Sequence, residues 1–210
     1  MKSDHINCPI RPRVELDNPD EPLEMIAFTI ARYKFACKWM REKDRVLEVG
    51  CGEGFGCNFF SRHCAHVTGL DIDPETVERC SLKYRRDNLK FVVDDIINPP
   101  SPPQPHFDSV VSFEMIEHVS QDDGRKMVQH CADHLKPGGL FILSTPRARE
   151  DRSVSRQYHH VYEYDYSTLT TLLESYFERV TIFCQNDEYI YAGHPSTAWN
   201  YVCLCFKAGV

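Results

Sequence analysis

Residues 46–56 read Val46-Leu47-Glu48-Val49-Gly50-Cys51-Gly52-Glu53-Gly54-Phe55-Gly56, an apolar run that passes directly into a glycine-rich turn. Glycine tolerates positive φ and has no Cβ, so a ligand can approach the backbone of such a turn closely. The dinucleotide fingerprint GxGxxG is absent, because its third glycine would fall on Phe55 or on Cys57, depending on the register. The remaining GxGxG pattern favours a nucleoside ligand without a pyrophosphate and disfavours an NAD-linked oxidoreductase.

Short apolar runs recur along the chain at 67–70, 91–93, 107–113 and 140–143, and helical segments separate most of them. Continuous hydrophobicity is typical of strands that are covered on both faces, and strands joined by helices form parallel sheets with right-handed crossovers. Helix signals agree with this pattern, because Asp73-Pro74 and Ser120 are start signals and Pro137-Gly138-Gly139 is a stop signal. The sequence therefore predicts an α/β fold with a doubly wound, Rossmann-like sheet.

Two regions outside this alternation are distinctive. Residues 1–22 are polar and interrupted by prolines, which predicts an arm or lid segment. After them, apolar side chains at three- and four-residue steps predict an amphipathic helix that packs on the core rather than on a partner; they are Leu23, Ile26, Ile30, Tyr33, Cys37 and Met40. We therefore expect an N-terminal arm and helix on the substrate side over 1–44 and a ligand-binding domain over 45–210.

Composition limits the classes of function. The chain has 210 residues, with 24 Lys and Arg against 31 Asp and Glu, for a formal net charge of -7. This balance makes nucleic acid an unlikely partner. The ten cysteines show no CxxC pair, and no apolar run approaches membrane-spanning length. We expect reduced thiols, no membrane span and a cytoplasmic location.

Acidic side chains follow the next two predicted strands. Asp71 comes about twenty residues after the glycine turn, where a carboxylate at a strand end can accept hydrogen bonds from both hydroxyls of a ribose. Asp94 and Asp95 follow the third strand and suit the exocyclic amine of an adenine, with Ile96 beside the ring. These residues predict a site for an adenine nucleoside.

With these motifs in order, the chain resembles the class I S-adenosylmethionine-dependent methyltransferases. The resemblance is carried by VLEVGCGEG, LDID, FVVDDI, FDSVVSFEMIEHV and LKPGGLFILSTP, which cover about Arg45 to Pro146 closely. It implies a seven-stranded sheet, mostly parallel with the last strand antiparallel. It also implies S-adenosylmethionine as the methyl donor, with S-adenosylhomocysteine as the product.

The resemblance also implies roles for individual residues. Glu48 would lie near the methionine amino group, Asp71 would hold the ribose, and Asp95 with Ile96 would contact the adenine. The family usually has a glycine where Asp94 stands, so either Asp94 or Asp95 could make the adenine contact. The full set of cofactor-binding candidates is Glu48, Gly50, Cys51, Gly52, Gly54, Asp71, Ile72, Asp94, Asp95, Ile96 and Glu114.

The fourth predicted strand ends in Glu114-Met115-Ile116-Glu117-His118, at the edge of the sheet where ligands bind in such folds. Methyl transfer to an alcohol needs alignment of donor and acceptor and removal of a proton. His118 is the best-placed base, although the same residue could instead cap or pack the following turn. His160, which lies in an aromatic segment further along, is the second catalytic candidate.

The ExxEH element and the later His-x-x-Glu element occur in two kinds of relative. They appear in small-molecule O-methyltransferases of the ubiquinone-pathway and sugar-modifying types. They also appear in small-RNA terminal 2′-O-methyltransferases, where two Glu and two His bind a divalent metal. By the second analogy Glu114, Glu117, His118 and His160 would be ligands for Mg²⁺ or Mn²⁺. We favour the metal-free alternative, because the chain is acidic and has no appended RNA-binding domain.

The sequence thus predicts a methyltransferase that acts on a hydroxyl of a small metabolite or sugar-like glycan unit. The alternatives are a metal-dependent RNA 3′-terminal 2′-O-methyltransferase and a non-catalytic donor-binding subunit. Arg147, Arg149, Arg152 and Arg156 either clamp an anionic group of the acceptor or belong to a solvated lid. The acceptor itself and the oligomeric state are left open.

Overall fold

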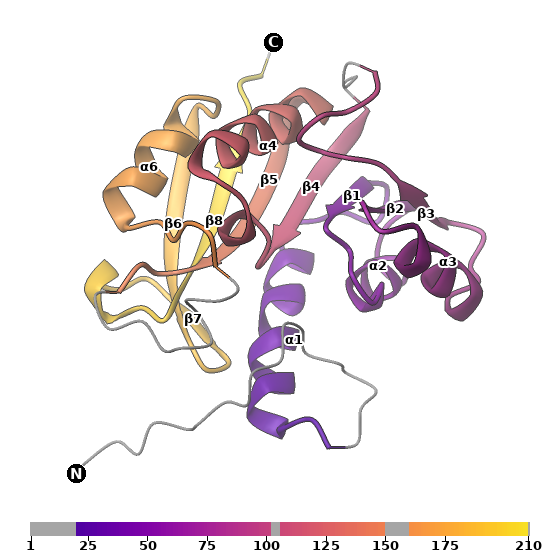
Figure 1. Cartoon of the computed structure of the whole chain (residues 1–210), viewed down its shortest axis with the longest axis horizontal. Coiled ribbons are helices and arrows are strands. Elements are labelled where there is room, and N and C mark those ends of the chain that lie inside the picture. Colours follow the sequence, from indigo (N-terminus) through magenta and orange to yellow (C-terminus); the bar gives the residue numbers. More distant parts are fainter. Residues whose placement is uncertain (1–19, 102–105, 150–159, 210) are drawn as a thin grey trace.

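A computed structural model describes residues 20–101, 106–149 and 160–209 (Figure 1). Its centre is one eight-stranded sheet with the order β3-β2-β1-β4-β5-β8-β6-β7. The strands are β1 (Arg45–Val49), β2 (His66–Asp71), β3 (Leu89–Val93), β4 (Phe107–Phe113), β5 (Leu135–Pro146), β6 (Arg179–Asn186), β7 (Tyr189–Tyr191) and β8 (Asn200–Phe206). The first five strands pair in parallel, whereas β8 runs antiparallel to both β5 and β6.

The helices begin where their side chains can satisfy the first free backbone N–H groups. Asp73 accepts hydrogen bonds from Glu75 N and Thr76 N, and Ser120 accepts one from Asp123 N, as their start signals predicted. Asp165 does the same for Thr168 N. The helices are α1 (Leu23–Cys37), α2 (Phe55–Phe60), α3 (Pro74–Lys83), α4 (Gln121–His134) and α6 (Tyr166–Glu174), with short 3-10 turns η1 (Ile116–His118) and η2 (Pro195–Thr197).

The predicted architecture is confirmed, and the predicted strand count of seven is wrong by one. The additional strand is β7, which forms a hairpin with β6 through the turn at Asp187. Asp187 has a φ of 47°, a left-handed conformation that Asp tolerates better than most residues. Three residues give too short an apolar pattern for such a strand to be recognised from the sequence.

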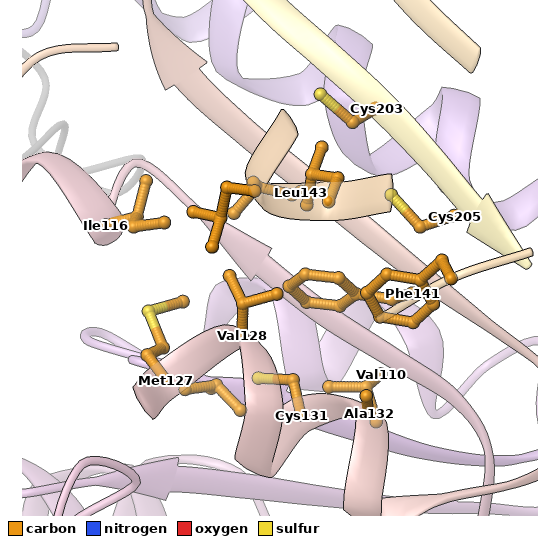
Figure 2. Close-up of a cluster of buried hydrophobic side chains, with 14 of the residues drawn as sticks. Val110, Ile116, Met127, Val128, Cys131, Ala132, Phe141, Leu143, Cys203 and Cys205 are labelled. Carbon is orange, nitrogen blue, oxygen red and sulfur yellow. The ribbon is translucent and has the colours of Figure 1, made fainter. Parts of the chain in front are cut away.

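Two apolar clusters cover the two faces of the sheet. On one face, α4 and α6 bury side chains against β4, β5 and β8, as Figure 2 shows for Val128 and Cys131 of α4 beside Val110 and Phe141. On the other face, α1 and α2 contribute Ala36 and Phe60 to a second cluster. Because both faces are covered, the central strands are apolar along their whole length, as the sequence runs indicated.

Helix α1 stands at the carboxyl end of β4 (Figure 1). The predicted apolar stripe is only partly correct, because Leu23 is 78% exposed and the fully buried positions are Arg32 and Ala36. Gln185 in the β6–β7 region donates a hydrogen bond to the carbonyl oxygen of Phe28 at 2.9 Å. The helix is therefore held by the last third of the chain as well as by α2.

Several expectations fall outside the described residues. They are the polar arm up to residue 19, part of the proline-rich connection between β3 and β4, and the positions Arg152 and Arg156. Within the described ranges, no helix is both long enough and apolar enough to cross a bilayer. The cysteines in these ranges are free thiols, and nearly all of them are buried.

Candidate active site

The glycine-rich turn forms the first wall of the site at the carboxyl end of β1. Gly50 N and Cys51 N both donate to the carbonyl oxygen of Leu70 at 2.9 and 3.0 Å, which ties the turn to β2. Gly50, Gly52 and Gly54 have φ values of 68°, 50° and 71°. Because residues with side chains rarely adopt this conformation, the turn requires glycine at these positions.

Asp71 connects this turn to the end of β2. Its buried carboxylate accepts hydrogen bonds from Gly52 N at 2.9 Å and from Asp73 N at 3.2 Å, one on each oxygen. Each oxygen keeps a second lone pair, so the carboxylate can still accept from two neighbouring hydroxyls. Ile72 follows with 65% of its surface exposed, which offers an apolar contact for a planar ring.

The end of β3 supplies the remaining candidates for the adenine. Asp95 accepts from Ile97 N at 2.8 Å and from Asn98 Nδ2 at 3.2 Å. Burial alone would raise the pKa of Asp95, but these hydrogen bonds outweigh it and lower the pKa. Asp94 Oδ1 accepts from Asp95 N, and the carbonyl oxygen of Ile96 accepts from His130 Nδ1. The choice between Asp94 and Asp95 as the adenine contact stays a prediction.

Glu48 lies between the turn, α1 and the start of α2. It is almost completely buried, and Tyr33 donates its phenolic hydrogen to Glu48 Oε1 at 3.0 Å. A Cβ on Gly56 would overlap both the Tyr33 ring and the Glu48 carboxylate, so this packing also requires a glycine. Burial raises the pKa of Glu48 to about 7, although hydrogen bonds from Cys57 and Tyr33 oppose the shift.

Glu114 ends β4 in a strained backbone conformation, with a φ of 52°. Its carboxylate accepts from Ser144 Oγ at 2.7 Å and from Asn200 Nδ2 at 2.6 Å, and it lies 3.5 Å from Arg32 Nη1. A non-glycine residue in this region costs of order 1–3 kcal/mol and persists where its surroundings hold it in place. Three polar partners from three different elements do so here.

Arg32 is a site residue that the sequence reasoning missed. It is buried on α1; its Nη1 pairs with Glu114 at 3.5 Å, whereas its Nε has no hydrogen-bond partner among the described residues. Its guanidinium lies 4.6 Å from the centre of the Phe28 ring. A buried guanidinium N–H without an acceptor fits an anionic ligand group, such as the carboxylate of a methionine moiety. The available signal was one arginine in the mostly apolar stretch 23–33.

A second polar cluster lies beyond the end of β4, around η1. Glu117 is almost fully buried, and its Oε2 accepts from Thr145 Oγ1 at 3.1 Å. Burial and the nearby charge of Glu114 raise the pKa of Glu117 well above its usual value. The His118 ring lies edge-on to the His160 ring with 5.3 Å between the ring centres. The cluster therefore brings together residues that are more than forty positions apart in the sequence.

The structure brings together three of the four predicted metal-ligand candidates. Glu117, His118 and His160 each offer an atom, and these atoms all lie within 4.8 Å of one another. The fourth, Glu114, uses its carboxylate on Ser144, Asn200 and Arg32. Of the predicted arginine clamp, Arg147 donates its Nε hydrogen to the carbonyl oxygen of Ala198 at 2.8 Å. That contact holds Arg147 against the loop before β8.

Comparison with known proteins agrees with this geometry. Residues 46–139 match the family described as "Methyltransferase domain". A probable S-adenosylmethionine-dependent methyltransferase of Mycolicibacterium smegmatis is 35% identical over 133 residues, which cover 62% of this chain and 50% of that protein. A ubiquinone biosynthesis O-methyltransferase of Xylella fastidiosa is 36% identical over 107 residues, which cover 48% of this chain and 41% of that protein.

Solved structures share the fold at lower identity. One is the complex between the Haloferax volcanii Trm112 methyltransferase activator and a methyltransferase, with a TM-score of 0.73, 19% identity and coverage of 89% of this chain and 92% of that one. Another is the N-methyltransferase NodS of Bradyrhizobium japonicum with S-adenosyl-L-homocysteine, with a TM-score of 0.65, 20% identity and coverage of 92% and 94%.

The fold is thus that of a Rossmann-like methyltransferase. Residues 46–139, somewhat under half of the chain, match the methyltransferase domain family, and a relative that aligns with 62% of the chain is named as a probable S-adenosylmethionine-dependent methyltransferase. The chain spans about half the length of the curated relatives that it matches. The glycine turn, Asp71 and Arg32 fit S-adenosylmethionine, because they offer a turn without Cβ atoms, acceptors for two hydroxyls and a guanidinium whose Nε has no acceptor among the described residues.

The raised pKa of Glu48 makes stability depend on pH. The folded protein holds the Glu48 proton up to about pH 7, whereas the ordinary value is 4.5. The contribution of Glu48 to stability is therefore full below about pH 4.5 and declines as the pH rises towards 7. We expect the free energy of unfolding of the donor-free wild type, relative to Glu48→Gln, to fall by about 3 kcal/mol across this range. Urea unfolding at several pH values measures this difference, and parallel curves would contradict it.

The geometry of Asp71 predicts a loss of donor affinity in Asp71→Asn. Replacing one oxygen by NH₂ removes the charge and turns a donor towards a backbone N–H, so we expect binding of S-adenosylhomocysteine to weaken by about 10- to 100-fold. Isothermal titration calorimetry measures the affinity, with circular dichroism as the check on folding. Asp187→Asn, in the β6–β7 turn at the far side of the sheet, should bind as the wild type does. Equal affinities for both variants would remove Asp71 from the donor site.

Proposed function

We propose that this protein is an S-adenosylmethionine-dependent methyltransferase that transfers a methyl group to a hydroxyl of a small metabolite or sugar unit. One observation carries the proposal: the histidine cluster around η1 adjoins the predicted donor site. A Cβ on Gly50 would lie 3.0 Å from Met115 Cγ, and Glu117 is the second residue after Met115. The charges of Glu114 and Arg32 also act on Glu117.

Each residue then has a separate task. When bound, S-adenosylmethionine supplies a methyl group on a sulfonium, which an oxygen nucleophile displaces in line. The glycine turn and Asp71 hold the nucleoside part, and Arg32 pairs with the methionine carboxylate. His118, whose side chain is 37% exposed, takes the hydroxyl proton on an imidazole nitrogen while the acceptor oxygen forms its bond to the methyl carbon. As the oxygen–carbon bond forms, the bond between the methyl carbon and the sulfur breaks, and the sulfur keeps the electron pair as the neutral thioether of S-adenosylhomocysteine. The oxygen thus gains a methyl group and His118 gains a proton.

The named relatives support a hydroxyl acceptor, since several are ubiquinone biosynthesis O-methyltransferases. Their identity to this chain is confined to part of each protein, and the N-methyltransferase NodS supports the fold alone. The net charge of -7 favours a small-molecule or glycan acceptor over nucleic acid. We further propose a cytoplasmic location, which the free thiols support.

The assigned role of His118 predicts a loss of turnover in His118→Ala without a loss of donor binding. We expect kcat to fall about 10²- to 10⁴-fold, because general base catalysis contributes that much, while affinity for S-adenosylhomocysteine changes less than twofold. The assay follows transfer of a labelled methyl group to a panel of phenolic and sugar hydroxyl acceptors. His66→Ala, exposed at the opposite end of β2, is the matched control. An unchanged kcat would exclude His118 as the base.

A second candidate function rests on the convergence of Glu117, His118 and His160. A carboxylate and two imidazoles form a ligand set that suits Mn²⁺ or Mg²⁺. An enzyme of this kind would activate a hydroxyl next to a second oxygen, as at the 3′ terminus of an RNA. In that mechanism His118 would be a ligand and could not act as the base.

Metal removal separates the two candidates. For base catalysis we expect EDTA to change kcat less than twofold, because His118 needs no cation to accept a proton. The measurement is turnover after extensive dialysis against EDTA, followed by titration with Mn²⁺. Activity that disappears with EDTA and returns with Mn²⁺ would overturn the metal-free mechanism and establish the second candidate. Donor binding without any turnover would support a non-catalytic donor-binding subunit.

A further inference from the structure

Glu163 is a buried carboxylate that the proposed function does not yet use. Its side chain is inaccessible to solvent, and it accepts a hydrogen bond from His160 Nδ1 at 2.7 Å. Burying a carboxylate costs several kcal/mol unless it is paired and hydrogen-bonded. A side chain that only filled this space could be apolar at lower cost. The carboxylate therefore points to a role in its contact with His160.

Backbone contacts fix the position of Glu163 relative to the site. On one side, Val161 N and Tyr162 N both donate to the carbonyl oxygen of Glu117, at 2.8 and 3.2 Å. On the other side, Ala148 N donates to the carbonyl oxygen of Tyr164 at 2.9 Å. The segment 160–164 is thus attached to η1 and to the end of β5. Neither Glu163 nor His160 can move far without breaking these bonds.

The contact determines which nitrogen His160 offers to the site. When Nδ1 carries the hydrogen that it donates to Glu163, the lone pair of the neutral ring is on Nε2. The ring lies edge-on to His118 and contributes an atom to the cluster with Glu117. A proton acceptor and a metal ligand both need this lone pair. Both mechanisms at η1, base catalysis and metal binding, therefore require the same tautomer of His160.

We infer that Glu163 is a positioning residue, which fixes His160 in the tautomer with its Nε2 lone pair free for the acceptor end of the site. This inference rests on the proposed function only where turnover is measured. Buried carboxylates that orient a functional imidazole are a general device, and their removal typically costs 10- to 100-fold in activity or metal affinity. The sequence marks Glu163 only as the last residue of a His-x-x-Glu element, and its burial and its contact with His160 come from the fold.

The direct test is the tautomer of His160 in the full-length protein saturated with S-adenosylhomocysteine. Nitrogen-15 NMR of the imidazole groups, with His160 assigned by comparison with His160→Asn, shows which ring nitrogen carries the hydrogen. We expect Nδ1 to be protonated and Nε2 to be free in the wild type. A ring with the hydrogen on Nε2, or with an even mixture of tautomers, would overturn the inference without any variant or acceptor.

Glu163→Gln tests the consequence for turnover. An amide can accept from Nδ1 or donate to it, so the variant no longer fixes the tautomer, as the charged carboxylate does. We expect mixed tautomers by NMR and a kcat about 10- to 100-fold lower with the best acceptor of the panel, with KM changed less than twofold. Glu163→Asp should restore part of kcat, and Glu174→Gln, exposed on α6, should behave as the wild type does.

The outcomes separate this inference from the proposed function. A wild-type kcat and a single tautomer in Glu163→Gln would overturn the positioning role while leaving the methyltransferase function intact. A wild type that methylates no acceptor in the panel would count against the function, and the tautomer measurement would still decide the role of Glu163. If Glu163→Gln fails to fold, the wild-type NMR spectrum and the kcat of Glu163→Asp still test whether Glu163 fixes the tautomer of His160.

Discussion

The hydrogen bond from Gly52 N to the Asp71 carboxylate is the constraint on which the donor end depends. It connects the turn after β1 to the end of β2, and it does so with a side chain that still has lone pairs to offer. The turn can make this bond because its glycines adopt positive φ. One buried carboxylate therefore both shapes the backbone of the site and presents acceptors to a ligand. The apolar strands around it supply the rigid frame.

The acceptor end depends on a different kind of constraint, because it is assembled from segments distant in the sequence. Glu117 and His118 follow β4, whereas His160 lies in the segment that leads into α6. Hydrogen bonds between Glu117 and residues 161–162 join these segments. Around the cluster lie three carboxylates, those of Glu114, Glu117 and Glu163, and the guanidinium of Arg32. Burying such a cluster of ionisable groups costs free energy unless they pair with one another or with a ligand.

Local pattern was sufficient for the fold and for the position of the glycine turn at the end of β1. The strands are continuous apolar runs, the caps at Asp73 and Ser120 are short-range signals, and the glycine turn is contiguous with β1. The prediction from local pattern was incorrect where long-range contacts determine which residues are buried and which strands pair. Leu23 belongs to a helical stripe yet is exposed. Arg32 is charged yet buried, because Glu114 from another element pairs with it. Likewise β7 exists only through its pairing with β6, and Glu163 is buried beside His160 because backbone bonds attach residues 161 and 162 to Glu117.

The two neighbouring residues Arg32 and Tyr33 give α1 a single rotational setting. Successive residues of an α-helix point about 100° apart, so one side chain reaches Glu114 at the end of β4 while the next reaches Glu48 on β1. Turning the helix by one residue would break both contacts at once, so α1 fixes the end of β4 relative to the end of β1. In the proposed function these two strand ends lie on the acceptor and donor sides, so an element that precedes the first strand of the sheet would align the two substrates.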